Sequence, residues 1–351
     1  MKEFYMSMAI EMSKKGIGFI NPDPLVGAVI IKNNCIIGKG FYKAFGEITA
    51  EQDAINNSIE DVKGSELYIN IEPSCEDILR YGFKKVFIGI EHPLFKGSQI
   101  AELRKCGVEV ELNILQESCR ELNEISLHYY NYGQPFVFTK WAMTLDGKIA
   151  TTTGDSKWIS GQGSLEFVHH LRQRVAAIMV GENTVRLDNP LLTTRLEGVE
   201  ISNPLRVILS TYGDIKDEAN VLKVDEKTKT LLVTSVNIPK EKEQRLLGFG
   251  VKLLKLPEEN GKIDFKVLVK ALGEMGIDSL YIEGGSGVLG AAFESGIVNL
   301  VYAAVAPKII GGSKAVTPVG GKGIEKMKDA IVLKRVSHVI VGDDVIIKGY
   351  I

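Results

Sequence analysis

The sequence has no surplus of charge of either sign, few cysteines and no long apolar run. Its 351 residues include 42 lysines and arginines against 44 aspartates and glutamates, so the formal net charge is −2. A balance this close to neutral argues against binding to nucleic acid or to an anionic membrane through charge. No uninterrupted apolar stretch approaches the roughly 20 residues that a membrane-spanning helix needs. We therefore expect neither nucleic acid nor a membrane as a partner.

Cysteine is scarce, and its four occurrences all lie within the first 119 residues, at Cys35, Cys75, Cys106 and Cys119. None belongs to a C-x-x-C pair, so we expect reduced, mostly buried thiols in a cytoplasmic protein. The N-terminal segment MKEFYMSMAIEMSKKG interleaves charged and apolar residues and ends in a glycine. This pattern predicts an amphipathic helix rather than a secretory signal.

Length and pattern predict two α/β domains, residues 1–133 and 134–351. In the first, VGAVIIK and CIIGKGF flank the hairpin signal Asn33-Asn34, and a helix is expected from about Ala50 to Ile59. A last helix, over Glu117 to Tyr130, is followed by YNYGQP, which breaks the pattern. The second domain restarts with PFVFTKWAM, and its apolar runs alternate with helical or polar stretches. This alternation predicts a largely parallel sheet covered on both faces.

A glycine-rich turn is the most informative segment of the second domain. In SLYIEGGSGVLGAAFESG a buried strand runs into Glu283, and Gly284–Gly287 then lead into a helix of small and apolar residues. Glycines at such a turn let backbone N–H groups approach a ligand, and the positive end of the helix dipole favours phosphate. Because short glycine motifs are common, a purely structural turn is the alternative interpretation.

Two polar loops follow other predicted strands. TKWAMTLDGKIATTTGDSKWIS contains Lys140, Ser156 and Trp158, and RVAAIMVGENTVRLDNPLLTTR lies between Arg172 and Arg195. Loops at the carboxyl ends of parallel strands bind the ligands of α/β proteins. Two flanking arginines suit bidentate capture of a substrate phosphate. The alternatives are a simple turn, a tryptophan in the core and solvated arginines.

Taken in order, LDGKIAT..GDSKW, VG..TV..DNP.LT.R and the EGGS turn resemble the C-terminal reductase domain of the riboflavin-biosynthesis deaminase–reductase family. The resemblance covers essentially all of residues 134–351. It implies a dihydrofolate-reductase-like α/β fold and an NADPH-dependent enzyme. The family reduces the ribose of 5-amino-6-(5-phosphoribosylamino)uracil to a ribityl chain. Hydride transfer is the cofactor's own chemistry, so the protein mainly orients the two partners.

The resemblance also implies which residues hold each partner. The positions that match the cofactor site are Met143, Trp158, Thr184, Asp188, Ser210, Gly284, Gly285, Ser286, Gly287, Val288, Leu289 and Gly290. Those that match the substrate site are Ser156, Arg172, Leu192, Arg195 and Glu283. Lys140 matches the substrate side, so Lys140 and Glu283 are the catalytic candidates, although the motifs identify no definite general acid. At Ser210 the family often has an aspartate.

Residues 1–133 resemble the deaminase domain of the same family, which has a cytidine-deaminase-like α/β/α fold. The match includes PLVGAV, Gly46, Ala50-Glu51 and Glu72-Pro73. A zinc deaminase needs H-x-E and a pair of cysteines, which supply three N/S ligands and a proton-shuttling glutamate. Here Thr49 stands at the histidine position, and the loop between the cysteines is deleted. The deletion leaves Ser74 at either cysteine position, with Cys75 one place out of register.

These departures predict a degenerate site that binds no metal, so zinc is absent and the deaminase domain is inactive. Asp23 also replaces the usual asparagine, and Glu51 is explained as a first-turn glutamate favoured by the helix dipole. The favoured function is therefore an NADPH-dependent reductase acting on a phosphoribosylaminopyrimidine, with a homo-oligomer expected. One alternative is a bifunctional enzyme with an atypical zinc site. The other, a non-catalytic nucleotide-binding or assembly protein, is disfavoured because the reductase motifs are intact.

Overall fold

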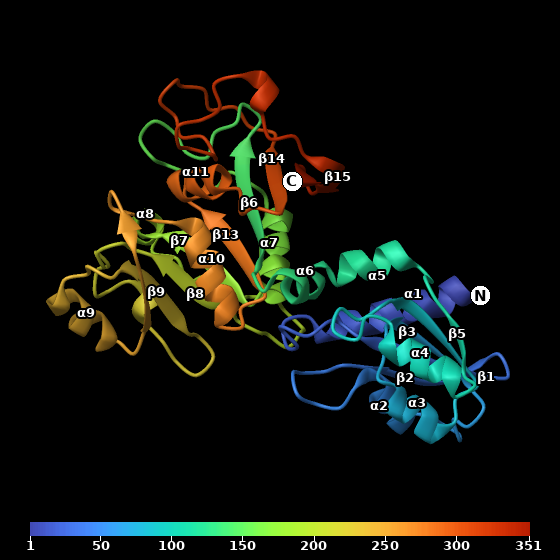
Figure 1. Cartoon of the computed structure of the whole chain (residues 1–351). Helices are drawn as coiled ribbons and strands as arrows, with labels where there is room; N and C mark the ends of the chain where they lie inside the picture. Colours follow the sequence, from blue (N-terminus) through green and yellow to red (C-terminus); the bar gives the residue numbers. More distant parts are fainter. The chain divides into compact units, whose positions relative to one another are not determined.

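The computed structural model describes residues 1–351, and the chain divides into two compact units, Met1–Gly133 and Gln134–Ile351. Each unit is built around its own main sheet (Figure 1). The last helix of the first unit ends at Tyr132, and the following residue, Gly133, has a φ of 65°, in the left-handed region that glycine tolerates after a helix end. None of the helices is both long and apolar enough to cross a bilayer.

The first unit contains a five-stranded sheet with the strand order β2-β1-β3-β4-β5. Its strands are β1 (Gly27–Lys32), β2 (Cys35–Phe41), β3 (Glu66–Ile71), β4 (Lys85–Ile90) and β5 (Glu109–Glu111). β1 is antiparallel to β2 and β3, whereas β4 is parallel to β3 and β5. The hairpin predicted between β1 and β2 is confirmed. Asn33 and Asn34 both have positive φ, 50° and 63°, as the type I′ turn requires.

Helices cover both faces of this sheet. They are α1 (Lys2–Ser13), α2 (Ala50–Asn56), α3 (Cys75–Tyr81), α4 (Ser98–Lys105), α5 (Gln116–Leu122) and α6 (Glu124–Tyr132). Ile30 on β1 packs in one core with residues of α2, α3 and α4, and its neighbour Val29 packs in the other with residues of α1 and α5. Successive strand residues point to opposite faces, so one apolar strand serves both cores. The result is a three-layer α/β/α unit.

Two expectations for the helices of this unit are corrected. α2 ends at Asn56 rather than at Ile59. The single helix expected over Glu117 to Tyr130 is two helices, α5 and α6, separated by Asn123. The buried side chain of Asn123 accepts a hydrogen bond from the backbone N–H of Leu25 and donates one to its carbonyl, so a tertiary contact fixes the break.

The cysteines were expected to be mostly buried, and this is wrong. Only Cys119 is buried, whereas Cys35 and Cys106 are exposed and Cys75 is half-buried. Cys35 opens β2 directly after the hairpin turn, and Cys106 caps the end of α4. All four are free thiols.

The second unit contains a nine-stranded sheet with the order β10-β9-β8-β7-β13-β6-β14-β16-β15. Its strands are β6 (Phe136–Thr144), β7 (Ala177–Gly181), β8 (Leu205–Leu209), β9 (Thr230–Ser235), β10 (Lys252–Leu256), β13 (Ser279–Gly284), β14 (Leu300–Ala306), β15 (Lys334–Val341) and β16 (Asp344–Tyr350). The strands from β10 to β14 in this order are parallel, and β16 and β15 form an antiparallel hairpin beside them. The largely parallel sheet is therefore confirmed.

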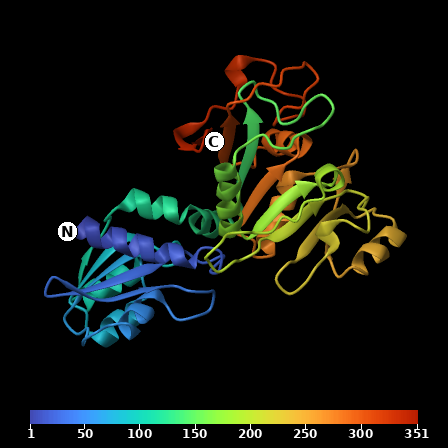
Figure 2. The ribbon, with the colours of Figure 1, turned by 180° about the vertical axis from the view of Figure 1, so that it is seen from behind.

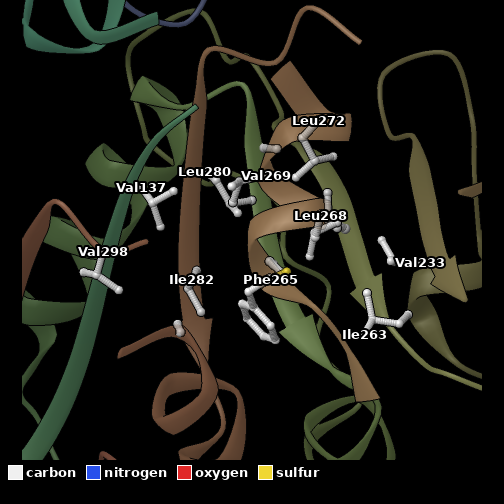
Figure 3. Packing of buried hydrophobic residues seen from close by; sticks show 14 of the residues in the cluster. Val137, Val233, Ile263, Phe265, Leu268, Val269, Leu272, Leu280, Ile282 and Val298 are labelled. Atoms are coloured by element: carbon white, nitrogen blue, oxygen red, sulfur yellow. The ribbon is translucent and has the colours of Figure 1, made fainter. Parts of the chain in front are cut away.

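Helices on the two faces of this sheet bury its apolar strands. They are α7 (Gln162–Arg174), α8 (Glu182–Asp188), α9 (Lys240–Leu247), α10 (Phe265–Glu274) and α11 (Ser286–Ser295). Leu268 and Leu272 of α10 pack with Leu280 and Ile282 of β13 (Figure 3). On the opposite face, seen toward the viewer in Figure 2, α7 contributes Phe167, which packs edge-on against Tyr302 of β14. Parallel strands between these layers bring their carboxyl ends to one edge of the sheet.

Candidate functional site

A cavity of about 840 Å³ opens at the carboxyl-terminal edge of the parallel strands. Its lining comes from the loop after β6, from the segments that follow β7, β8 and β13, and from α11. Several residues assigned from the motifs to the cofactor or substrate lie in this lining: Ser156, Thr184, Asp188, Ser210, Gly285, Ser286, Gly287 and Val288. Residues up to 132 positions apart in the sequence (Ser156 and Val288) are thus brought to one concave surface.

The glycine turn presents the amino-terminal end of α11 to this cavity. Gly284 has a φ of 129°, which an L side chain rarely adopts, and Gly285 is the residue before the helix, with φ −12° and ψ 161°. The first intrahelical bond runs from the N–H of Leu289 to the carbonyl of Gly285. The preceding N–H groups, Ser286 to Val288, have no intrahelical acceptor, as at every helix start. They lie in the cavity wall, where an anionic group is favoured.

Thr184 packs directly against this turn. Its hydroxyl oxygen accepts a hydrogen bond of 3.2 Å from the backbone N–H of Gly285. A Cβ atom added at Gly285 would lie 3.0 Å from the same oxygen, whereas one added at Gly287 would meet no atom within 4 Å. A side chain at position 285 would therefore crowd Thr184, whose hydroxyl would have to shift by a few tenths of an ångström.

Other residues from the same motif positions lie outside the cavity. The side chain of Leu289 belongs to the hydrophobic core, because the helix turns this position toward the sheet. Gly290 packs on the backbone of Gly320, whose carbonyl oxygen would lie 2.5 Å from an added Cβ. Met143 is half-buried on β6, and Trp158 is 68% exposed on the loop after β6. The carbonyl of Trp158 accepts a hydrogen bond from Lys308, which attaches this loop to the segment after β14.

Arg172 and Glu283 form a bidentate ion pair on the α7 face of the sheet. Nε and Nη2 of Arg172 donate to the two carboxylate oxygens of Glu283 at 3.0 and 2.6 Å, and Nη1 donates to the carbonyl of Thr193 at 2.9 Å. Arg195, by contrast, is exposed, with one bond of 3.2 Å from Nη1 to the Thr193 hydroxyl. The two arginines predicted to clamp a phosphate together thus differ, since Arg172 already holds a carboxylate and Arg195 faces solvent.

Lys140 lies beside this ion pair, with only 6% of its surface exposed. Burial lowers the pKa of Lys140 to about 8, and the charge of Arg172 acts in the same direction, while the carboxylates of Glu283 and Asp344 oppose the shift. An amine with this pKa is still mostly protonated near neutral pH and gives up its proton more readily than an exposed lysine. Lys140 and Glu283, the two catalytic candidates, are therefore electrostatic neighbours.

The role of Asp344 was not predicted from the sequence. This buried carboxylate at the start of β16 accepts hydrogen bonds from the backbone N–H of Gly161 at 2.8 Å and from the hydroxyl of Ser164 at 2.6 Å. Gly161 is the residue before α7 and carries no capping side chain of its own. Asp344 therefore caps α7 from another strand, an arrangement that an acidic residue in a hairpin turn does not signal. Leu192 has a buried side chain and a positive φ of 56°, so only its backbone is available to a substrate.

In the first unit, the residues at the zinc-ligand positions serve as helix caps. The hydroxyl of Thr49 accepts a 3.3 Å hydrogen bond from the backbone N–H of Gln52 at the start of α2. The hydroxyl of Ser74 accepts one of 3.3 Å from Glu76 at the start of α3. No group of three or more histidine, cysteine, aspartate or glutamate side chains is placed to hold a metal ion. These residues do not fit the three-ligand zinc site of a deaminase.

Three other acidic side chains of this unit, Glu51, Glu72 and Asp23, are buried or hydrogen-bonded within the protein. Burial raises the pKa of Glu51 to about 7, and its side chain also interacts with Thr49. Glu72 accepts hydrogen bonds from four backbone N–H groups between His92 and Ile100, which fixes the turn before α4. Asp23 accepts hydrogen bonds from the hydroxyls of Tyr42 and Tyr130 at 3.0 and 2.7 Å.

Comparison with known proteins accounts for both units. The sequence model of the RibD C-terminal domain matches residues 135–347, and that of the cytidine and deoxycytidylate deaminase zinc-binding region matches residues 1–90. The riboflavin biosynthesis protein RibD of Actinobacillus pleuropneumoniae is 38% identical to this chain and covers 98% of it, over 93% of its own length.

The chain belongs to the RibD family.

Solved RibD structures share the fold of the whole chain. The structure of a diaminohydroxyphosphoribosylaminopyrimidine deaminase/5-amino-6-(5-phosphoribosylamino)uracil reductase from Thermotoga maritima superposes with a TM-score of 0.86 at 32% identity, covering 99% of this chain and 98% of its own. One form of Acinetobacter baumannii RibD gives a TM-score of 0.89 at 27% identity, with the same coverage. The resemblance read from the motifs and the expected fold class, a cytidine-deaminase-like unit followed by the RibD reductase unit, are confirmed.

Proposed function

We propose that this RibD protein uses NADPH to reduce the ribose of 5-amino-6-(5-phosphoribosylamino)uracil to the ribitylamino product, and that its deaminase unit is inactive. The observation that carries the proposal is the position of Lys140 on β6 and of Glu283 on β13, because the 840 Å³ cavity opens at the carboxyl ends of these parallel strands; Arg172 of α7 holds Glu283 in place. The Thermotoga maritima relative bears the name of both a deaminase and this reductase. The second unit of our chain retains the groups that the reductase part needs.

The cavity suits a dinucleotide in size and in its polar groups. A pyrophosphate on the N–H groups of Ser286 to Val288 would be favoured by the α11 dipole, and Gly284 and Gly287 leave open space for it. Thr184 and Ser210 supply hydroxyls in the same wall. When bound, NADPH supplies the hydride. The protein's part is to hold the nicotinamide end toward β6 and β13.

The substrate side is built from Arg195, Glu283 and Lys140. Arg195 is exposed and carries the charge that a ribose phosphate needs, whereas Arg172 fixes the orientation of Glu283. Conversion of the ribosyl group to a ribityl chain adds a hydride to C1′ and a proton to the former ring oxygen. Lys140, whose pKa is lowered by burial to about 8, is suited to give this proton. The carboxylate of Glu283 favours the protonated form of Lys140 until the proton is transferred.

The inactive deaminase is supported by the caps at Thr49 and Ser74, because hydroxyls that already accept helix N–H bonds replace the expected nitrogen and sulfur ligands. The match of residues 1–90 to a zinc-binding region favours the alternative, a bifunctional enzyme with an unusual metal site. Two measurements separate these functions. Elemental analysis of the purified protein should find far less than one equivalent of zinc, and stoichiometric zinc removable by a chelator would favour the alternative.

The second measurement supplies the aminated and the deaminated pyrimidine separately and follows NADPH absorbance. The proposal expects oxidation of NADPH with the deaminated substrate and no release of ammonia from the aminated one. Ammonia release from the aminated pyrimidine would favour the alternative, a bifunctional enzyme. The absence of oxidation with either substrate would favour a non-catalytic protein.

We further propose that the chain forms a homo-oligomer through β15. This strand is an edge of the nine-stranded sheet, and its residues are exposed along almost its whole length, including Val339 at 50% and Ile340 at 70%. Antiparallel pairing of two copies would bring Lys334 and Arg335 of one copy toward Asp343 of the other. Light scattering should show a dimer or larger assembly that Ile340→Lys dissociates. A monomer in the unchanged protein would refute this interface.

A further inference from the structure

Arg195, the proposed phosphate ligand, lies in a segment without regular structure. Residues 189–204, between α8 and β8, form neither a helix nor a strand. The guanidinium of Arg195 donates to the hydroxyl of Thr193 at 3.2 Å, and the backbone N–H of Thr194 donates to the side chain of Asn203 at 2.9 Å. Both contacts stay within the segment, and segments of this kind are the more mobile parts of a fold. The direction of the Arg195 side chain therefore depends on what fixes its backbone to the rest of the unit.

Helix α7 fixes this backbone at two points. Nη1 of Arg172 donates to the carbonyl of Thr193 at 2.9 Å, and Nδ1 of His169 accepts a 3.2 Å hydrogen bond from the backbone N–H of Arg195. His169 and Arg172 are three residues apart in α7, so they are neighbours on the same face of the helix. Of these two contacts, the one from His169 is made with Arg195 itself.

Nearby groups keep the imidazole of His169 in the form that can accept this hydrogen bond. Burial lowers the pKa of His169 to about 4, and the charges of Arg172 and Arg195 act in the same direction, whereas the carboxylate of Glu283 and the carbonyl of Thr193 oppose the shift. The imidazole is therefore uncharged near neutral pH, and an uncharged imidazole has one nitrogen that accepts. A protonated imidazole would have only donors and would lose the contact with Arg195.

The position of Arg195 in turn decides where a substrate phosphate lies. Burial and the charge of Arg172 lower the pKa of Arg195, and the carboxylate of Glu283 opposes this shift, so the guanidinium lies within electrostatic reach of the Arg172–Glu283 pair. The same pair acts on Lys140. A phosphate bound to Arg195 would therefore place the attached ribose near the two catalytic candidates, Lys140 and Glu283.

We propose that His169 is a positioning residue for the substrate phosphate: through Nδ1 it holds the backbone of Arg195, so that the guanidinium meets the phosphate of the phosphoribosyl group. The proposal deepens the proposed function and rests on its assignment of Arg195 to the phosphate. His169 acts through Arg195 and does not itself contact the substrate. Because the loss of one hydrogen bond changes an affinity by up to about tenfold, an effect of this size is expected.

Steady-state kinetics of the full-length chain separate positioning from a merely structural role. His169→Gln fills the space of the imidazole but has no acceptor at the Nδ1 position, whereas His169→Asn keeps one there. We expect His169→Gln to raise KM for the phosphoribosyl substrate about tenfold, with kcat and the affinity for NADPH within about twofold, and His169→Asn to bring KM back to within about threefold. The matched control is His170→Gln, because the imidazole of His170 is exposed and lies 3.9 Å from Glu166 of the same helix. It should change none of these values.

Two further measurements test whether the effect passes through Arg195 and through the phosphate. In the Arg195→Ala background, His169→Gln should raise KM by less than about twofold, because no guanidinium is left to position. Binding of ribose 5-phosphate, followed by ligand-observed NMR, needs no turnover. It should be about tenfold weaker for His169→Gln than for the unchanged protein, whereas ribose without the phosphate should not distinguish the two.

The outcomes separate the proposal from the reaction that it deepens. An unchanged KM in His169→Gln, a fall in kcat in place of the rise in KM, equal effects of Gln and Asn, or the full effect in the Arg195→Ala background would overturn the proposal. The absence of ribose 5-phosphate binding by the unchanged protein would also overturn it. If ribose 5-phosphate binds with the expected dependence on His169 but the pyrimidine substrate causes no oxidation of NADPH, the proposed reaction is refuted and the positioning role stands.

Discussion

The two units of this chain differ in whether the polar groups at their candidate sites are already hydrogen-bonded within the protein. In Gln134–Ile351 the helix start at Ser286 lies in the wall of a large cavity, and the buried ammonium of Lys140 has only electrostatic neighbours. In Met1–Gly133 the residues at the zinc-ligand positions of the deaminase motif, Thr49 and Ser74, are hydrogen-bonded to helix N–H groups. The proposed reductase site therefore leaves polar groups available to a ligand, whereas the hydroxyls of Thr49 and Ser74 are satisfied within the protein. Fold similarity alone does not reveal this difference.

The largest effect should follow from Lys140→Met, which removes the proposed proton donor but keeps a long apolar stem. We expect kcat to fall by about 10²–10⁴, with dinucleotide binding unchanged. In the unchanged protein, kcat should decrease as pH rises through about 8, because burial lowers the pKa of Lys140 to that value and only the protonated amine donates. Stopped-flow measurement of hydride transfer across this pH range checks both. A flat pH profile would remove Lys140 from this role.

Gly285→Val should weaken NADPH binding by about 100-fold, since the added side chain crowds Thr184 and blocks the approach to the α11 amides. The positive φ of this turn is at Gly284, whereas Gly285 has φ −12°, so the strain of a positive φ does not arise at position 285. Calorimetry measures the affinity for NADPH, and thermal melting measures the stability of the variant. A variant that melts earlier yet binds NADPH normally would show that the turn is only structural.

Arg195→Ala should reduce kcat/KM for the phosphoribosyl substrate by about 10- to 100-fold, because a charge-assisted hydrogen bond to phosphate is worth about 1.5–3 kcal/mol. Its exposed guanidinium contacts only Thr193, so stability should change little. NADPH affinity serves as the internal control. An unchanged kcat/KM would place the phosphate elsewhere.

The smallest effect is expected in the first unit, Met1–Gly133. Thr49→Ala should lower the stability of the first unit by about 1 kcal/mol, since it removes the cap of α2. Reductase activity should be unaffected. Chemical denaturation followed by a probe in residues 1–133 measures the loss, and Thr49→Ser, which keeps the hydroxyl, is the control. If Ala and Ser behave alike, the hydroxyl does not act as a cap.

Much of the fold was predictable because it depends on local pattern. The apolar runs of the second unit became parallel strands, and Asn33-Asn34 formed the expected turn. The errors arose where distant contacts intervened. Asn123 ends α5 through Leu25, 98 residues away, and Cys35 and Cys106 are exposed because turns and helix ends place them at the surface.

The sequence by itself determined the family, the glycine turn and the absence of zinc ligands at Thr49 and Ser74, because these are statements about residue types at fixed spacing. Only the tertiary structure decided what each polar group contacts. Arg172 forms an ion pair with Glu283, 111 residues away, and is not free to bind a phosphate. Asp344 caps α7 through Gly161, 183 residues away. The lowered pKa of Lys140 likewise depends on burial between packed layers. Charge pairing and desolvation depend on distance in space, and only the folded chain sets that distance.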